Sequence, residues 1–217
     1  MRRSKRISTL CLLAGWLFLC GGCAPGSEKA EPPAITASGN LECVQYSSFS
    51  GTFPEDGSGR QVNNVAAILV HNSSAEFLDY AKVSCAIGNE SGTFLVTGLP
   101  PGAMAWVLER DAKTVEADED FAALQCREYS FRQDAVMATD KLAVSASGNT
   151  VTVSNQSGQT LHNVCLYYKS VHEDGHYFGG ITYMLSFGDL DPGETAQKQS
   201  SHYGAQSQIV RYSFQES

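Results

Sequence analysis

Basic residues are scarce in this chain of 217 residues. Its 15 lysines and arginines are outnumbered by 23 aspartates and glutamates, which gives a formal net charge of −8. Nucleic-acid binding needs a basic patch that neutralises phosphates, and electrostatic adsorption to anionic lipid headgroups needs the same charge. The composition therefore argues against a nucleic-acid partner, and any membrane attachment must come from another feature of the chain.

Two common catalytic motifs are also missing. The sequence has neither a GxSxG turn nor a glycine-rich phosphate loop. Residues 172–176 (HEDGH) form the one cluster of metal-ligand residue types, and two histidines near a turn leave the third and fourth ligands unsupplied. We predict no metal, no cofactor and no catalytic activity. An envelope hydrolase or a metal carrier remains as an alternative.

The N-terminal segment has the features of an export signal. Residues 2–6 carry four positive charges and no acid, residues 7–19 are mostly apolar, and Gly21 and Gly22 precede Cys23. Charged, apolar and small-residue stretches in that order are typical of a secretory signal, and the apolar run is shorter than the ~20 residues that span a membrane. We predict a signal peptide over residues 1–22, with an uncleaved N-terminal helix as the alternative.

Residues 20–23 (CGGC) resemble a bacterial lipobox, in which an aliphatic and two small residues precede a cysteine that is acylated before cleavage. The chain departs from that pattern because Cys20 stands where leucine is usual. The resemblance implies a lipoprotein with lipid on Cys23, held on the extracytoplasmic side of the cell membrane. Cleavage by the general secretory peptidase is the alternative. Residues 23–40, polar and rich in proline, then read as a lipidated flexible tether.

Comparing the chain with itself indicates a duplication. Residues 41–47 (LECVQYS) recur 83 positions later as residues 124–130 (LQCREYS). At the same offset Ile68, Val70, Asn72, Ser74 and Leu78 fall on Val151, Val153, Asn155, Ser157 and Leu161. Residues 99–102 (LPPG) match residues 190–193 (LDPG) at an offset of 91, so the second copy has eight extra residues between these points.

Each copy consists of short apolar or alternating segments separated by turns. Residues 161–169 alternate with a period of two, which buries one face of a strand, and Asp174-Gly175 is a two-residue hairpin signal. Short strands at this spacing predict an all-β protein with two tandem immunoglobulin-like antiparallel β-sandwiches. We place the first over residues 41–132 and the second over residues 133–217. Residues 123–131 resemble both an opening and a closing strand, and we assign them to the first.

The second copy resembles the FxLYD-type immunoglobulin-like repeats of bacterial surface lipoproteins. The resemblance is carried by residues 155–158 (NQSG), 161–169 (LHNVCLYYK) and 190–194 (LDPGE). It departs from the family at the name motif, where Tyr168 replaces aspartate, and at the long insertion 177–183. The resemblance implies a surface binding or spacer module, and it brings no catalytic residues.

Four cysteines remain after the signal is removed and Cys23 takes its lipid. They are Cys43, Cys85, Cys126 and Cys165, an even number that permits three pairings in an exported protein. Cys43 and Cys126 occupy equivalent strands of the two copies, so a disulfide between them is one possibility. Buried thiols that pack as small apolar side chains are the other.

Aromatic residues crowd the predicted hairpin of the second copy. Some must fill the core, and the others suit an exposed surface for protein or carbohydrate recognition. The candidate binding surface is Tyr167, Tyr177, Phe178 and Tyr183. The function expected is therefore a lipid-anchored cell-envelope binding or adhesion module, whose partner beyond the membrane is an envelope protein or a glycan. A structural spacer or subunit of an envelope assembly is the second interpretation.

Overall fold

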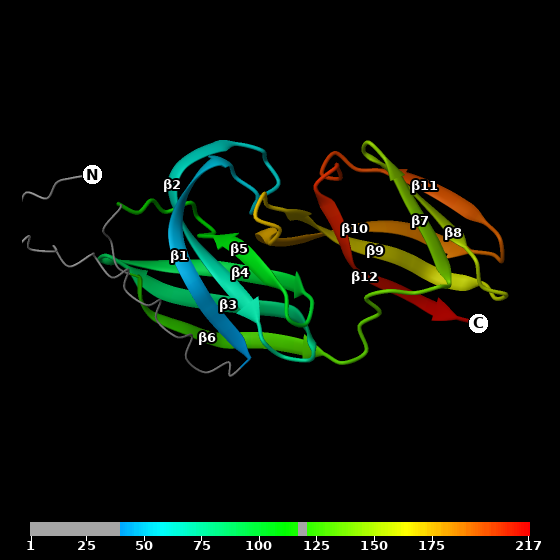
Figure 1. Ribbon diagram of the computed structural model, residues 1–217, viewed down its shortest axis with the longest axis horizontal. Helices are drawn as coiled ribbons and strands as arrows, with labels where there is room; N and C mark the ends of the chain where they lie inside the picture. Colours follow the sequence, from blue (N-terminus) through cyan, green and yellow to red (C-terminus); the bar gives the residue numbers. More distant parts are fainter. Residues whose placement is uncertain (1–39, 117–120) are drawn as a thin grey trace, which may run out of the picture. The chain divides into compact units, whose positions relative to one another are not determined.

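The computed structural model describes residues 40–116 and 121–217, and these residues are all β with no helix among them (Figure 1). Consequently no helix in those ranges is long and apolar enough to cross a membrane. The strands are β1 (Leu41–Thr52), β2 (Gln61–Asn72), β3 (Phe77–Ile87), β4 (Glu90–Leu99), β5 (Met104–Leu108), β6 (Phe121–Arg132), β7 (Leu142–Ser147), β8 (Thr150–Asn155), β9 (Leu161–Val171), β10 (Tyr177–Leu190), β11 (Thr195–Gln199) and β12 (Ser207–Glu216). The prediction of an all-β protein is confirmed.

The strands form one large and two small sheets. The six-stranded sheet has the order β1-β2-β5-β10-β9-β12, and the three-stranded sheets have the orders β4-β3-β6 and β11-β8-β7 (Figure 1). Neighbouring strands pair antiparallel except β10 and β5, which are parallel. That parallel pair joins three strands from each half of the chain into one sheet, where the sequence had predicted two separate sandwiches.

Alternation along the strands explains where the apolar side chains lie. In β2, Ala66 and Ile68 face a core shared with β3, β4 and β6. Val65 and Ala67 belong instead to a small apolar cluster on the opposite face of the sheet. A further core lies between β7 and β8 and the second half of the six-stranded sheet. The six-stranded sheet is therefore apolar on both faces in its first half.

Residues 1–39, which include the predicted signal, Cys23 and nearly all of the tether, lie outside the described residues. Residues 123–131, whose assignment was ambiguous, lie in β6, which pairs with β3 of the first half. The described residues all belong to one compact unit.

A buried asparagine closes the first half of the chain. Asn72 is fully buried at the end of β2, and its side-chain amide donates to the carbonyl oxygen of Leu99 at 3.0 Å. Its Oδ1 accepts the backbone N–H of Ser74 at 3.1 Å and the Ser74 hydroxyl at 2.7 Å. A turn that would otherwise leave buried polar groups unpaired is thereby satisfied from one side chain.

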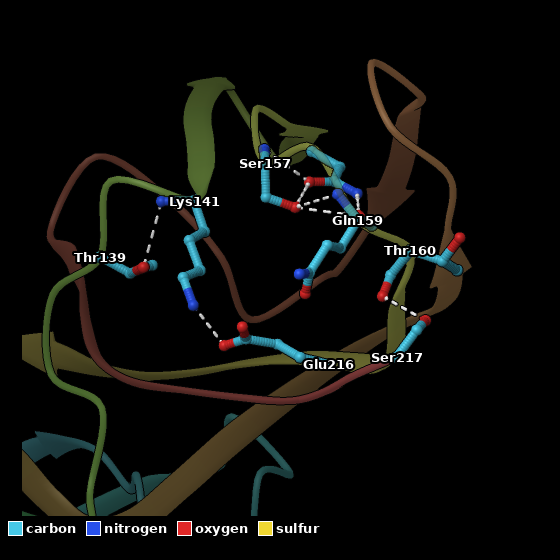
Figure 2. A network of polar contacts seen from close by, with 8 residues as sticks. Thr139, Lys141, Ser157, Gln159, Thr160, Glu216 and Ser217 are labelled. Carbon is cyan, nitrogen blue, oxygen red and sulfur yellow. Dashed lines mark hydrogen bonds and ion pairs between the residues drawn. The ribbon is translucent and has the colours of Figure 1, made fainter.

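The second half contains the same arrangement. Asn155 is also buried, donates to the carbonyl oxygen of Leu190 at 2.8 Å and accepts the backbone N–H of Ser157 at 2.9 Å. Figure 2 shows this turn, in which the Ser157 hydroxyl also donates to the carbonyl oxygen of Gln159 at 2.9 Å. The residues that the sequence comparison aligned therefore make matching hydrogen bonds.

Candidate functional site

The candidate site is a small hollow on the outer face of the six-stranded sheet, over the strands of the first half and the start of β10. Its volume is about 140 Å³. Pockets for drug-sized ligands measure roughly 300–1,000 Å³, so this hollow has room for one ring or one side chain. Its lining residues are Ser47, Ser48, Phe49, Ala67, Trp106, Leu108, His172 and Phe178.

Strand register brings these residues together. Ala67 of β2 lies beside Ser47 of β1 on one side and beside Leu108 of β5 on the other. Trp106 follows on β5 and pairs with Phe178 at the start of β10. Because side chains at alternate positions of a strand share a face, Trp106 and Leu108 point to the same side of the sheet. The hollow therefore depends on the single parallel contact between β5 and β10.

Aromatic rings form the walls of the hollow. The rings of Phe49 and Phe178 lie with centroids 5.0 Å apart, tilted by 55°. The imidazole of His172 lies 5.4 Å from the Phe178 ring at 33°. Offset and tilted ring pairs of this kind are favourable, and they hold flat apolar surfaces at fixed angles.

One carboxylate, that of Asp174, contacts two residues that line the hollow. The indole N–H of Trp106 donates to Asp174 Oδ2 at 2.8 Å, and the backbone N–H of His176 donates to Asp174 Oδ1 at 3.0 Å. His172 Nδ1 is 3.2 Å from the same Oδ1. Partial burial raises the pKa of Asp174, but these contacts outweigh it and hold the pKa below its ordinary value. Asp174 is therefore an anion that fixes the orientation of the Trp106 ring.

A buried lysine contacts the start of β10, two residues after Phe178. Lys169 of β9 is completely buried, and its Nζ donates to the carbonyl oxygens of Ile181 at 2.8 Å, Thr97 at 3.0 Å and Gly180 at 3.2 Å. An ammonium has three donors and no acceptor, so three carbonyl oxygens satisfy it. Because Thr97 belongs to β4 and Lys169 to β9, this side chain ties the two halves of the chain together.

Glu55, in the loop between β1 and β2, contacts Gly180 as well. Its carboxylate accepts the N–H of Gly180 at 2.8 Å and the N–H of Leu108 at 2.8 Å. The Gly180 peptide therefore lies between an acid that accepts from its N–H and a lysine that donates to its carbonyl oxygen. A Cβ on Gly180 would come within 1.7 Å of the carbonyl oxygen of Leu95, so only glycine fits.

Burial moves the pKa values of this pair toward each other. Desolvation raises the pKa of Glu55, and the backbone donors of Leu108 and Gly180 and the charge of Lys169 act against it. Desolvation lowers the pKa of Lys169, and the charge of Glu55 acts against it. Removing either charge therefore leaves the other buried without a counter-charge, which destabilises the folded chain.

The predicted binding surface is divided by the structure. Phe178 lines the hollow, whereas Tyr177 packs against the first core. Tyr183 stacks on Tyr168 and His202 with centroid distances of 5.3 Å and 4.7 Å. The fourth residue, Tyr167, lies under the guanidinium of Arg211 at 3.9 Å. The four side chains are all half-buried, and only Phe178 belongs to the hollow.

The cysteines are thiols in the structure. Cys43, Cys85 and Cys126 are buried and Cys165 is half-buried, and all four are free, so the structure holds no bridge between Cys43 and Cys126. Burial raises the pKa of Cys43 to about 11 and that of Cys85 to about 12. Thiolates are the reactive form, so these thiols pack as small apolar groups in this state of the protein.

Residues 172–176 (HEDGH) also match the letters of the zinc-peptidase motif HExxH. That motif works on a helix, where the two histidines share one face. Here Glu173 and Asp174 form the turn between β9 and β10. Over residues 40–116 and 121–217 no group of three or more His, Cys, Asp or Glu side chains is placed to hold a metal ion. The sequence match alone therefore does not indicate a zinc site.

A scan of protein-family models finds no match to the chain, and a search of curated proteins finds none either. The site must therefore be interpreted from its own geometry.

Proposed function

We propose that this protein is a lipid-anchored binding module of the bacterial cell envelope that holds one small chemical group of its partner in the aromatic hollow. The hollow is the observation that carries the proposal. It combines Phe49, Trp106 and Phe178 with an anion, Asp174, and such preformed concave sites with few polar groups are typical of ligand binding. The partner class proposed is an envelope protein or a glycan, and no catalytic step is included.

The anchor and the repeat fold belong to the same proposal. The lipobox-like residues 20–23 support acylation of Cys23, after which residues 24–40 would carry the β domain away from the lipid surface. The matching hydrogen bonds of Asn72 and Asn155 support two diverged immunoglobulin-like sandwiches related to the FxLYD repeats. A Cys23→Ser variant should lose incorporated fatty acid and leave the membrane fraction.

The hollow can be tested by fluorescence because the chain has only two tryptophans, Trp16 in the predicted signal and Trp106 in the hollow. In the full chain carrying Trp16→Phe, we expect envelope glycans or envelope proteins to change the emission of Trp106. Phe178→Ala should abolish the response. Tyr167→Ala is the matched control, because Tyr167 was predicted for the same surface but lies outside the hollow. Equal loss in both variants, or no response to any envelope fraction, would overturn the assignment.

A structural spacer is the second candidate, and one observation favours it. The six-stranded sheet contains strands of both halves, and Lys169 donates to the carbonyl oxygens of Thr97 in the first half and Ile181 in the second. A rigid unit of this kind suits a spacer, which holds the other components of an envelope assembly at a fixed distance. Loss of an envelope assembly on deletion, without any ligand at the hollow, would favour the spacer.

A further inference from the structure

We propose that the group held in the aromatic hollow is a quaternary ammonium, a cation whose nitrogen carries only alkyl groups. This inference rests on the proposed function, since it names the ligand of the same hollow. It follows from the walls, the charge and the hydrogen-bonding capacity of the site.

The walls favour a cation. The faces of Phe49, Phe178 and Trp106 carry negative electrostatic potential, and aromatic rings gathered around one site attract cations on that account. The same apolar cluster already shows such a contact, because the guanidinium carbon of Arg60 lies 4.3 Å from the centre of the Phe53 ring. Aromatic side chains on this face of the sheet therefore accept positive charge within the protein itself.

The charges around the hollow point the same way. Asp174, which contacts the lining residues Trp106 and His172, is held as an anion, and no lysine or arginine is among the lining residues. The whole chain has a formal charge of −8, which becomes −12 if residues 1–22 with their four basic residues are removed. A cation is therefore attracted at long range as well as at contact.

The number of hydrogen-bond donors on the cation distinguishes a quaternary ammonium from other organic cations. Each oxygen of Asp174 already accepts a hydrogen bond, from Trp106 or from His176, so part of the acceptor capacity of this carboxylate is used. A guanidinium brings five N–H donors and a primary ammonium three, and each donor left unpaired in an apolar site costs free energy. A quaternary nitrogen has no donor to satisfy. The volume of about 140 Å³ also suits one compact alkylated group.

The test uses the full chain carrying Trp16→Phe, with Trp106 emission and calorimetry as readouts. Choline is the probe, and its control is the neutral alcohol in which a carbon atom replaces the nitrogen. Choline should bind at least about tenfold more tightly than this isostere, because the two differ only in charge. Methylguanidinium should bind more weakly than choline. Potassium chloride at the same ionic strength corrects for screening.

Two variants sharpen the expected result. Phe178→Leu keeps an apolar wall but removes a π face, so it should weaken choline severalfold and leave the neutral isostere unchanged. Asp174→Asn should also weaken choline severalfold and spare the isostere. Circular dichroism of both variants checks that the fold is kept, and Phe49→Leu replaces either variant that does not fold. Phosphocholine binding more tightly than choline would indicate a headgroup as the natural source, and the reverse a free solute.

The remaining outcomes test the ligand assignment separately from the proposed function on which it rests. If the neutral isostere binds as tightly as choline, or methylguanidinium binds more tightly, the quaternary ammonium is wrong while the hollow remains a binding site. The same holds if a glycan changes Trp106 emission and choline does not. If choline, glycans and envelope proteins all leave Trp106 emission unchanged, both the inference and the proposed function are overturned.

Discussion

Asn72 in the first half of the chain and Asn155 in the second make the same hydrogen bonds at the end of corresponding strands. Each donates to a strand-end carbonyl, that of Leu99 or Leu190, and each accepts from a serine two residues later. The separation between donor and carbonyl differs, however. It is 27 residues in the first half and 35 in the second. The two halves share their turn and differ in the hairpin that the turn encloses.

The longer hairpin builds the candidate site. In the first half β3 and β4 pair up to a tight turn between Ile87 and Glu90. In the second half β9 and β10 are joined by a wider turn, and the start of β10 extends to pair with β5. That extension places Phe178 beside Trp106 and the Gly180 peptide between Glu55 and Lys169. The difference between the halves therefore locates both the hollow and the buried junction that Glu55, Gly180 and Lys169 form.

The largest effect should come from breaking the buried pair at that junction. Glu55→Gln leaves the Lys169 charge without a counter-charge and turns an amide donor toward the N–H groups of Gly180 or Leu108. Lys169→Met leaves the Glu55 charge uncompensated and removes the lysine donor from three carbonyl oxygens. Those of Thr97 and Gly180 keep the hydroxyl groups of Thr182 and Thr97 as donors. Each substitution should cost about 3–5 kcal/mol of unfolding free energy, measured by urea denaturation.

A surface pair in the second half provides the matched control. Lys141 contacts Glu216 near the chain end, as Figure 2 shows, and both side chains are more than a third exposed. Lys141→Met should cost only about 0–1 kcal/mol. The double variant Glu55→Gln with Lys169→Met should cost less than the sum of the two single changes. Strict additivity would show that the two groups do not depend on each other.

Short-range patterns sufficed to predict the class of fold. Period-two alternation over residues 161–169 and the turn around Asn155 indicate strands without any tertiary information, and the structure has β9 and that turn there. The parallel pairing of β10 with β5 left no such signal. It depends on two residue pairs, Tyr177 with Ala105 and Phe178 with Trp106, from distant parts of the chain. Pairings of this kind are set by the whole fold rather than by local sequence.

The site was predicted only in part for the same reason. Phe178 was among the candidates because aromatic residues cluster around it. Trp106 stands in the short apolar stretch 104–108 and gave no indication of its role. Glu55 reads as part of a solvated turn and Lys169 as the polar end of an alternating strand. Their burial results from partners 125 and 72 residues away in sequence, Gly180 and Thr97 respectively.

A smaller effect should follow from removing the asparagines that the two halves share. Asn72→Ala and Asn155→Ala each leave buried backbone groups without a partner, which costs about 1–3 kcal/mol. If the two turns are equivalent, both variants should lower the free energy of unfolding by similar amounts. Urea denaturation of the two variants measures this. A loss confined to one of them would mean that the matching bonds do not have matching importance.

The buried Glu55–Lys169 pair should also make the stability of the protein depend on pH. The pKa of Glu55 is raised from 4.5 to about 7, so the folded chain holds this proton more tightly than the unfolded chain. Stability should therefore fall as the pH rises from 4.5 toward 7. The pKa of Lys169 is lowered from 10.5 to about 7, so the unfolded chain binds more protons above neutrality. Stability should rise again between pH 7 and 10.5.

The two opposite slopes give a minimum near neutral pH in the free energy of unfolding, because each shift disfavours the folded chain as the pH approaches neutrality from its own side. The measurement is the difference in unfolding free energy between the wild type and the Glu55→Gln, Lys169→Met double variant across this pH range. The difference cancels the titration of all the exposed acids, which both proteins share. A flat difference would mean that Glu55 and Lys169 titrate alike in the folded and unfolded chains. The extended hairpin of the second half would then hold Gly180 between them by hydrogen bonds alone, without a cost for burying charge.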